Sequence, residues 1–103
     1  MEQFREINTN VLIAQIGMGN ILAISGGRVI KRRTGVTLPV SNGYSVTVDY
    51  TFDDLYQVSR VFTRAGVVSI KGTVDEVDYG SVGEVTYKAS CFRNVEFPSK
   101  GGN

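Results

Sequence analysis

A chain of 103 residues, with 11 cationic and 10 acidic side chains and a formal net charge of +1, has the size of one domain. Hydrophobic residues make up 42% of the chain and charged residues 20%, which is typical of a globular protein and excludes an intrinsically disordered one. The net charge carries no whole-chain signature of nucleic-acid binding, so such binding would need a local basic patch.

The chain also lacks several side chains on which much enzyme chemistry depends. The chain has no histidine, which excludes Ser-His-Asp and Cys-His catalytic sites and zinc sites that need histidine. Its single cysteine, Cys91, forms no internal disulfide, fits a reducing compartment and is interpreted as a small buried side chain. The longest apolar stretch, residues 11–25, is too short to span a bilayer. We therefore predict a cytoplasmic protein that is not an enzyme and that uses no metal and no cofactor.

Two elements are predicted before the first cluster of charge. Asn8 and Thr9 are favourable N-cap residues, and the apolar residues after them predict a short helix over residues 10–16. The apolar run ILAIS, residues 21–25, is typical of a short buried strand. The Gly-Gly pair after it predicts a hairpin turn, so that residues 28–40 would form the return strand, interrupted near a Thr-Gly pair and ended by a proline.

Three further strands follow the Asn42-Gly43 pair, which is the strongest turn signal in the chain. Residues 44–52 alternate apolar and polar side chains without exception, which predicts a strand with one buried face and one polar face. Residues 55–63 and 67–79 repeat the alternation after short turns. In the last strand, the residues expected on the apolar face are Val68, Ile70 and Val74.

The final element changes its period from that of a strand to that of a helix. Over residues 81–92 apolar side chains recur at helical intervals, and Ser81 and Glu84 have the spacing of a capping box. The predicted fold class is therefore α+β: an antiparallel four- to five-stranded meander sheet with an N-terminal and a C-terminal helix packed on one face. We expect a single domain over residues 1–97 and a flexible polar tail over residues 98–103.

The run RVIKRRTG, residues 28–35, is the densest cluster of charge in the chain. In a strand its cations would alternate between the two faces, which favours edge-strand charge that prevents unwanted pairing with other chains. The open alternative is an anion or nucleic-acid site that combines this cluster with a cation from a later strand. The residues that would contact a macromolecule are Arg28, Lys31, Arg32, Arg33 and Lys71.

The later strands bear on both interpretations. Lys71 is expected on the open face with Ser69 and Thr73, where it could face a phosphate. Arg60 shares its side with apolar neighbours and is expected to extend its charged end to the rim of the sheet. The aromatic residues fall on the apolar side, whereas a sheet that stacks bases needs them on its open face. The acidic pairs near the turns match no metal-binding loop and are interpreted as turn residues.

A resemblance to a known group of proteins is carried by the stretches Leu22–Gly27, Thr34–Val36, Val61–Arg64 and Ala89–Arg93. These stretches resemble small proteins of unassigned function from actinobacterial bacteriophages and prophages, and the likeness extends from the first helix to about Val95. The resemblance implies a phage accessory protein that acts in the cytoplasm of the host cell, and it supplies no active site.

Together these observations favour a small non-enzymatic phage accessory protein that acts as a protein-interaction module, with a host or phage protein as its partner. An open sheet face and exposed edge strands suit strand addition, and they suit self-association into a homo-oligomer as well. The alternative function is nucleic-acid binding through the local basic patch. No membrane is expected as a partner.

Overall fold

The computed structural model describes residues 3–91 and Phe97. Its elements, in chain order, are α1 (Thr9–Ile16), α2 (Met18–Ser25), β1 (Ile30–Lys31), β2 (Gly35–Pro39), β3 (Tyr44–Tyr50), β4 (Tyr56–Arg64), β5 (Val67–Val77) and α3 (Val82–Ser90). The tail predicted over residues 98–103 lies outside the described residues, as does residue 92 at the end of the predicted last helix.

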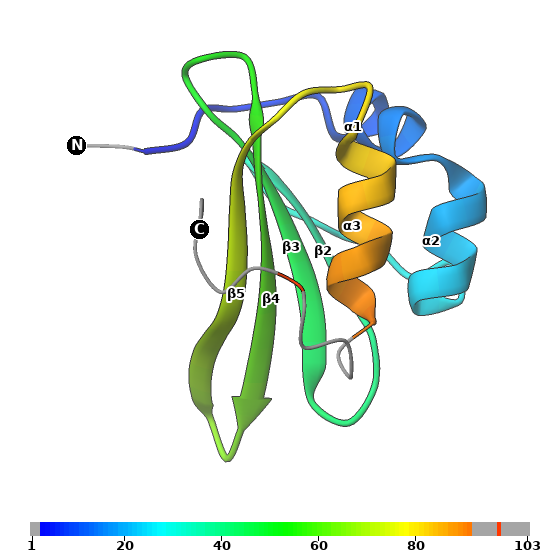
Figure 1. The fold of residues 1–103 in the computed structure, drawn as a ribbon, viewed down its shortest axis with the longest axis vertical. Helices are drawn as coiled ribbons and strands as arrows, with labels where there is room; N and C mark the ends of the chain where they lie inside the picture. The colour runs from blue at the N-terminus through cyan, green and yellow to red at the C-terminus, as the bar shows by residue number, and fades with distance from the viewer. Residues whose placement is uncertain (1–2, 92–96, 98–103) are drawn as a thin grey trace.

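The strands form one antiparallel sheet in the order β1-β2-β3-β4-β5, so each strand pairs with its neighbours in sequence (Figure 1). The strand predicted from the alternation of residues 44–52 is confirmed as β3, in which Val46 and Val48 are fully buried on one face. Asn42 and Gly43 both have positive φ angles, 56° and 86°, in the turn that joins β2 to β3. This meander confirms the predicted fold class.

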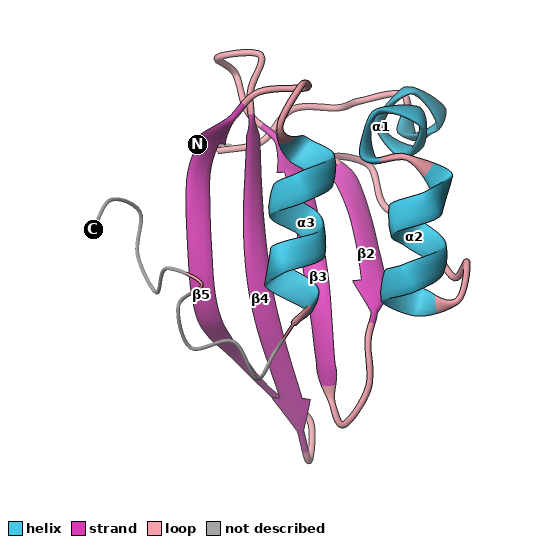
Figure 2. Cartoon of the chain, turned by 45° about the vertical axis from the view of Figure 1, so that its right-hand side comes forward, coloured by secondary structure: helices cyan, strands magenta, loops and turns pink. Residues whose placement is uncertain are grey.

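The helices of the described chain all pack on one face of the sheet (Figure 2). The core between the two layers consists of Leu12, Ile16, Ile21, Ile24, Val36, Leu38, Val46, Val48, Tyr56, Val58, Val77, Val82, Ala89 and Phe97. The helix α3 fits closely against the junction of α1 and α2, because a Cβ at Gly83 would lie 2.6 Å from the carbonyl oxygen of Ile16. The other face of the sheet carries no helix from the described chain.

The strand predicted over residues 21–25 is wrong, since these residues form the second half of the helix α2. A short apolar run fits a buried strand and a buried helix equally well, and here Ile21, Ile24 and Ser25 are buried at helical spacing. The Gly-Gly pair ends this helix and does not turn a hairpin. Gly26 has a left-handed φ of 67°, and the amides of both glycines donate to carbonyls of the last helical turn.

The hairpin at this end of the chain lies inside the charge cluster. The two-residue strand β1 pairs with β2 in the register Ile30 to Thr37 and Lys31 to Val36. The predicted interruption of the strand is confirmed, because the chain turns between β1 and β2, where the amide of Arg32 donates to the carbonyl of Gly35. An added Cβ at Gly35 would lie 1.8 Å from the carbonyl oxygen of Val48 on β3, so only glycine fits here.

The last helix begins one residue later than predicted, and the capping box is absent. Ser81 occupies the N-cap position, but its side chain makes no capping hydrogen bond. The carboxylate of Asp78 instead accepts the Ser81 amide at 2.9 Å, so the acid that precedes the helix satisfies this donor.

Candidate functional site

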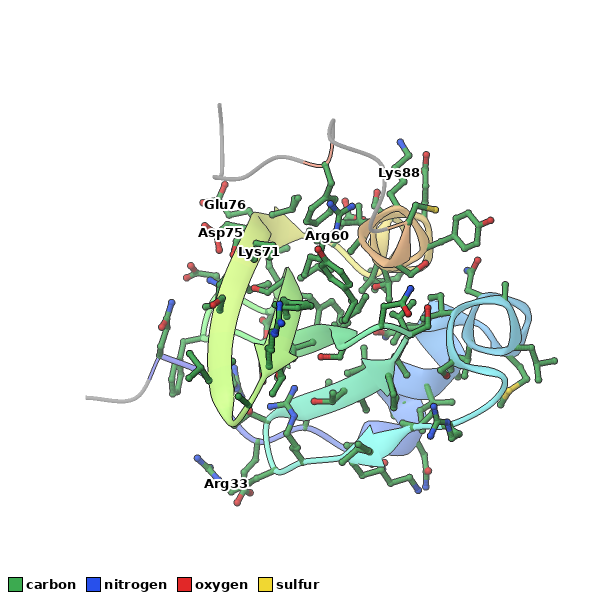
Figure 3. The ribbon with its side chains drawn as sticks, turned by 90° about the horizontal axis from the view of Figure 1, so that it is seen from below. Arg33, Arg60, Lys71, Asp75, Glu76 and Lys88 are labelled. Atoms are coloured by element: carbon green, nitrogen blue, oxygen red, sulfur yellow. The ribbon has the colours of Figure 1, made fainter. Side chains whose placement is uncertain are left out.

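The five cations expected to contact a macromolecule lie at opposite edges of the sheet. Arg28 to Arg33 surround β1 at one edge, whereas Lys71 lies in β5 at the other edge, with β2, β3 and β4 in between. Figure 3 shows Arg33 at the bottom of the view, away from Lys71 in its upper half. The fold therefore does not bring these cations together in one patch.

The Arg32 side chain makes its hydrogen bonds with residues of β2 and β3. Its Nε donates to the Thr37 hydroxyl at 2.9 Å, and its terminal nitrogens donate to the Asp49 carboxylate and to the Val36 carbonyl at 2.8 Å. Asp49 is only 7% exposed and also accepts the hydroxyl of Thr34 at 2.8 Å. A buried carboxylate needs such donors, so Arg32 stabilises the β1–β2–β3 corner.

The neighbouring cations also face polar groups of the chain. The Lys31 ammonium donates to the Asn10 side chain at 3.3 Å, and a guanidinium nitrogen of Arg33 lies 3.8 Å from the Glu6 carboxylate. Glu6, Arg32 and Arg33 line an open depression of about 480 Å³ beside the start of α1. Because Glu6 places a negative charge in this depression, an anion would meet both signs of charge there.

Among the residues that the structure describes, Arg60 is the only buried cation, which corrects the expectation that it reaches the rim. The residue is 5% exposed, and its guanidinium donates to the carbonyls of Ala89 at 2.8 Å, Cys91 at 3.0 Å and Lys88 at 3.3 Å. Its guanidinium also lies 4.7 Å from the centre of the Phe97 ring. Burial lowers the pKa of Arg60 below its usual value. The side chain thus satisfies the last carbonyls of α3, a role that sequence spacing alone does not reveal.

The edge strand β5 is interrupted by two bulges. Arg60 pairs with Gly72 and Val61 pairs with Ile70, which leaves Lys71 as an extra residue without an opposite on β4. A second shift lies at residues 75–76, where Glu76 has a left-handed φ of 59°. These bulges leave Val67–Ile70 as the regular part of β5 nearest to the β4–β5 turn.

The bulge at Lys71 changes which side chains share a face. Val74 pairs with the buried Val58 and packs against the core, whereas Ile70 pairs with Val61 on the opposite face. The prediction that Val68, Ile70 and Val74 share one buried face is therefore wrong. Lys71 does not lie on the open face as expected, because its ammonium is 5.9 Å from the centre of the Phe62 ring on the helix-covered side, the side that Ser69 also shares.

The regular part of β5 exposes an unusual amount of aliphatic surface. The side chains of Val67, Val68 and Ile70 are 65%, 63% and 67% exposed. In Figure 1 the β4–β5 hairpin extends beyond the end of α3, so no helix of the described chain covers its tip. We call Val67–Ile70 the exposed β5 segment.

The sheet has a strong separation of charge along β5. Between Asp54 and Asp75 the chain contains no acidic residue, and its cations are Arg60, Arg64 and Lys71. The opposite end of the strand carries Asp75 and Glu76, which line a shallow depression of about 330 Å³ together with Asp53. In the described part of the chain, no group of three or more acidic or Cys side chains is arranged to hold a metal ion.

Within residues 3–91, no helix has the length and apolar character needed to cross a membrane. Comparisons with protein families, with curated proteins and with solved structures find no match to this chain.

Proposed function

We propose that the protein is a small non-enzymatic accessory protein of phage type, acting in the host cytoplasm, that binds an extended segment of another protein along the exposed β5 segment. The observation that carries this proposal is the exposure of Val67, Val68 and Ile70 on an edge strand. Edge strands are usually protected by charges and bulges, and clustered exposed aliphatic side chains indicate an interaction surface.

The two bulges of β5 define where pairing is feasible. Lys71 and the pair Asp75 and Glu76 interrupt the strand, and bulges with charged residues are common protection against strand addition. The exposed β5 segment lacks this protection, and no other described strand pairs with its outer edge. An incoming strand would gain main-chain hydrogen bonds there and contacts with the aliphatic side chains.

The exposed aliphatic side chains would contribute only modestly to the free energy of binding a partner. Fully burying a Val or Ile side chain contributes roughly 1.5–3 kcal/mol, and each of these three side chains is about two thirds exposed. Their burial would contribute roughly 3–6 kcal/mol in total, which the cost of association largely offsets. A partner would therefore need further contacts on the adjacent sheet surface to bind tightly.

Nucleic-acid binding through Arg28, Lys31, Arg32, Arg33 and Lys71 has less support. The five cations lie at two edges of the sheet, and Arg32 already neutralises the buried Asp49. Duplex binding by phosphate contacts needs several cations on one surface, with a steep dependence on salt.

Affinity capture from a bacterial lysate, with and without nuclease, separates the two functions. The test variant is Val68→Thr with Ile70→Thr, which keeps the β-branched shape and removes aliphatic contact. The matched control is Ile30→Thr, a residue 53% exposed on the other edge strand. We expect nuclease-resistant capture of a protein by the wild type and the control, with clear loss in the double variant. Capture that nuclease abolishes, or that the double variant retains in full, would contradict the proposal.

A further inference from the structure

We infer that the segment bound at the exposed β5 segment is acidic: an extended strand in which aliphatic residues alternate with Asp or Glu. This inference rests on the proposed function and adds the chemistry of the partner. Three observations carry it, namely the cations that flank the segment, the absence of acids in residues 55–74, and the position of Lys71 in a bulge.

The exposed β5 segment lies between two cations. Arg64 closes β4 opposite Val67, and Lys71 follows Ile70 directly. Both side chains are exposed, and residues 55–74 of the sequence contain no acidic residue. An incoming strand with carboxylates near its ends would meet one cation on each side, whereas a basic strand would meet repulsion at both.

The same charges disfavour a second copy of this chain as the occupant. Antiparallel pairing of two exposed β5 segments would place Lys71 of each copy beside the β4–β5 turn of the other copy, next to Arg64. Like charges on directly paired strands are destabilising. Pairing one copy's segment with the acidic part of another copy's β5 would meet the bulge at residues 75–76, which interrupts a regular edge.

The bulge gives Lys71 a role in choosing the partner. A lysine on an edge strand discourages pairing in general, but its charge also rewards a strand that carries a carboxylate at the matching position. The ammonium lies 5.9 Å from the centre of the Phe62 ring of the neighbouring strand β4, so its charge stays beside the exposed β5 segment. Lys71 therefore favours acidic strands over neutral ones, and neutral strands over basic ones.

The test is an amide chemical-shift titration of the full chain with three blocked peptides that differ only in charge. Their sequences are Glu-Val-Thr-Val-Glu, Gln-Val-Thr-Val-Gln and Lys-Val-Thr-Val-Lys. We expect shifts centred on the amides of residues 67–70, with the acidic peptide binding about fivefold tighter than the neutral one, since two exposed ion pairs contribute about that much. The basic peptide should bind more weakly than the neutral one.

Charge reversal at the flanking cations provides the sharpest check. The variant Arg64→Glu with Lys71→Glu should reverse the order of the three peptides. If that variant fails to fold, Arg64→Gln with Lys71→Gln replaces it and should abolish the preference. The matched control, Arg28→Glu with Lys31→Glu, changes two exposed cations at the other edge and should leave the preference unchanged.

Each other outcome contradicts a different statement. If the amides of residues 67–70 respond equally to all three peptides, strand addition stands and the acidic preference is wrong. If no peptide shifts these amides, the proposed function itself is wrong. A dimer in sedimentation, with these amides at its interface in the absence of peptide, would make a second copy the occupant and overturn the inference.

Discussion

Replacing Arg60 by methionine is the most direct test of how α3 is fixed to the sheet. Methionine keeps an unbranched apolar stem and removes only the guanidinium. In the structure, that group donates to the carbonyls of Ala89 and Cys91 at 2.8 and 3.0 Å and lies over the Phe97 ring. The substitution would leave these carbonyl oxygens at the end of α3 without their donor.

The expected loss of stability follows from two opposing contributions. A hydrogen bond from a charged donor contributes roughly 1.5–3 kcal/mol, and Arg60 makes two short ones. Desolvation of the buried guanidinium opposes this, and it is also the cause of the lowered pKa of Arg60. Because the carbonyls stay behind when the guanidinium is removed, we expect the free energy of unfolding to fall by about 2–4 kcal/mol.

Urea unfolding followed by circular dichroism measures this change. For a small domain the slope is about 1 kcal/mol per molar, so the midpoint should fall by about 2–4 M, and the melting temperature by roughly 10–20 °C. Arg64→Met makes the same chemical change on an exposed residue of the same strand and should cost less than about 0.5 kcal/mol. Equal effects of the two substitutions would refute the reasoning, since the bonds of Arg60 would then only offset its desolvation.

Further substitutions test other parts of the fold. Asp49→Asn removes the charge that Arg32 neutralises and should lower the free energy of unfolding by roughly 1–3 kcal/mol in urea titrations, with little further loss when Arg32→Met is added. Gly35→Ala should prevent folding or cost more than about 4 kcal/mol, because its Cβ would lie 1.8 Å from a β3 carbonyl oxygen, whereas Gly19→Ala has open space in α2 and should stabilise by up to about 1 kcal/mol. Burial raises the pKa of Tyr56 above 10.0, so its contribution to stability is complete below the unfolded-state pKa and is lost as pH rises through the folded-state pKa. The free energy of unfolding should therefore decline above about pH 10, and Tyr56→Phe should make that decline shallower in urea titrations at stepped pH.

The strands β3 and β4 were predictable because local signals agree with their tertiary environment. Strict alternation of side chains identifies a strand with one buried face, and the Asn42-Gly43 turn sets where β3 begins. The helix α1 was predictable for a similar reason, since Asn8 caps it with its own side chain and Gly17 ends it. In each case the decisive information lies within a few residues.

The errors arose where neighbours in space decide the outcome. The run of residues 21–25 is apolar enough for a strand or a helix, and only packing against α3 and β2 selects the helix. The bulge at Lys71 depends on pairing with β4, and without knowing it the alternation of β5 assigns Ile70 to the wrong face. Arg60 binds carbonyls about 30 residues away in sequence, so no local pattern indicates its partners.

The candidate site was missed for the same reason. Val68 and Ile70 read as core residues in the sequence because aliphatic side chains in an alternating strand usually are. Their exposure follows from the bulge and from the length of the β4–β5 hairpin, neither of which the alternation encodes. The basic cluster at residues 28–35, in contrast, was prominent in the sequence but divides in the fold between ion pairs and exposed positions.

The extra residue in β5 also bears on whether the chain aggregates into fibrils. Because Lys71 has no opposite on β4, a deletion of this residue would leave the pairing of the strand unchanged. It would, however, join Val67–Ile70 to Gly72–Val74 in one continuous edge without charge or proline. Segments of six or seven residues with high β-propensity and no charge are those that stack into fibrils. A single lysine between two short uncharged stretches thus separates the exposed β5 segment from a longer edge that would recruit many strands.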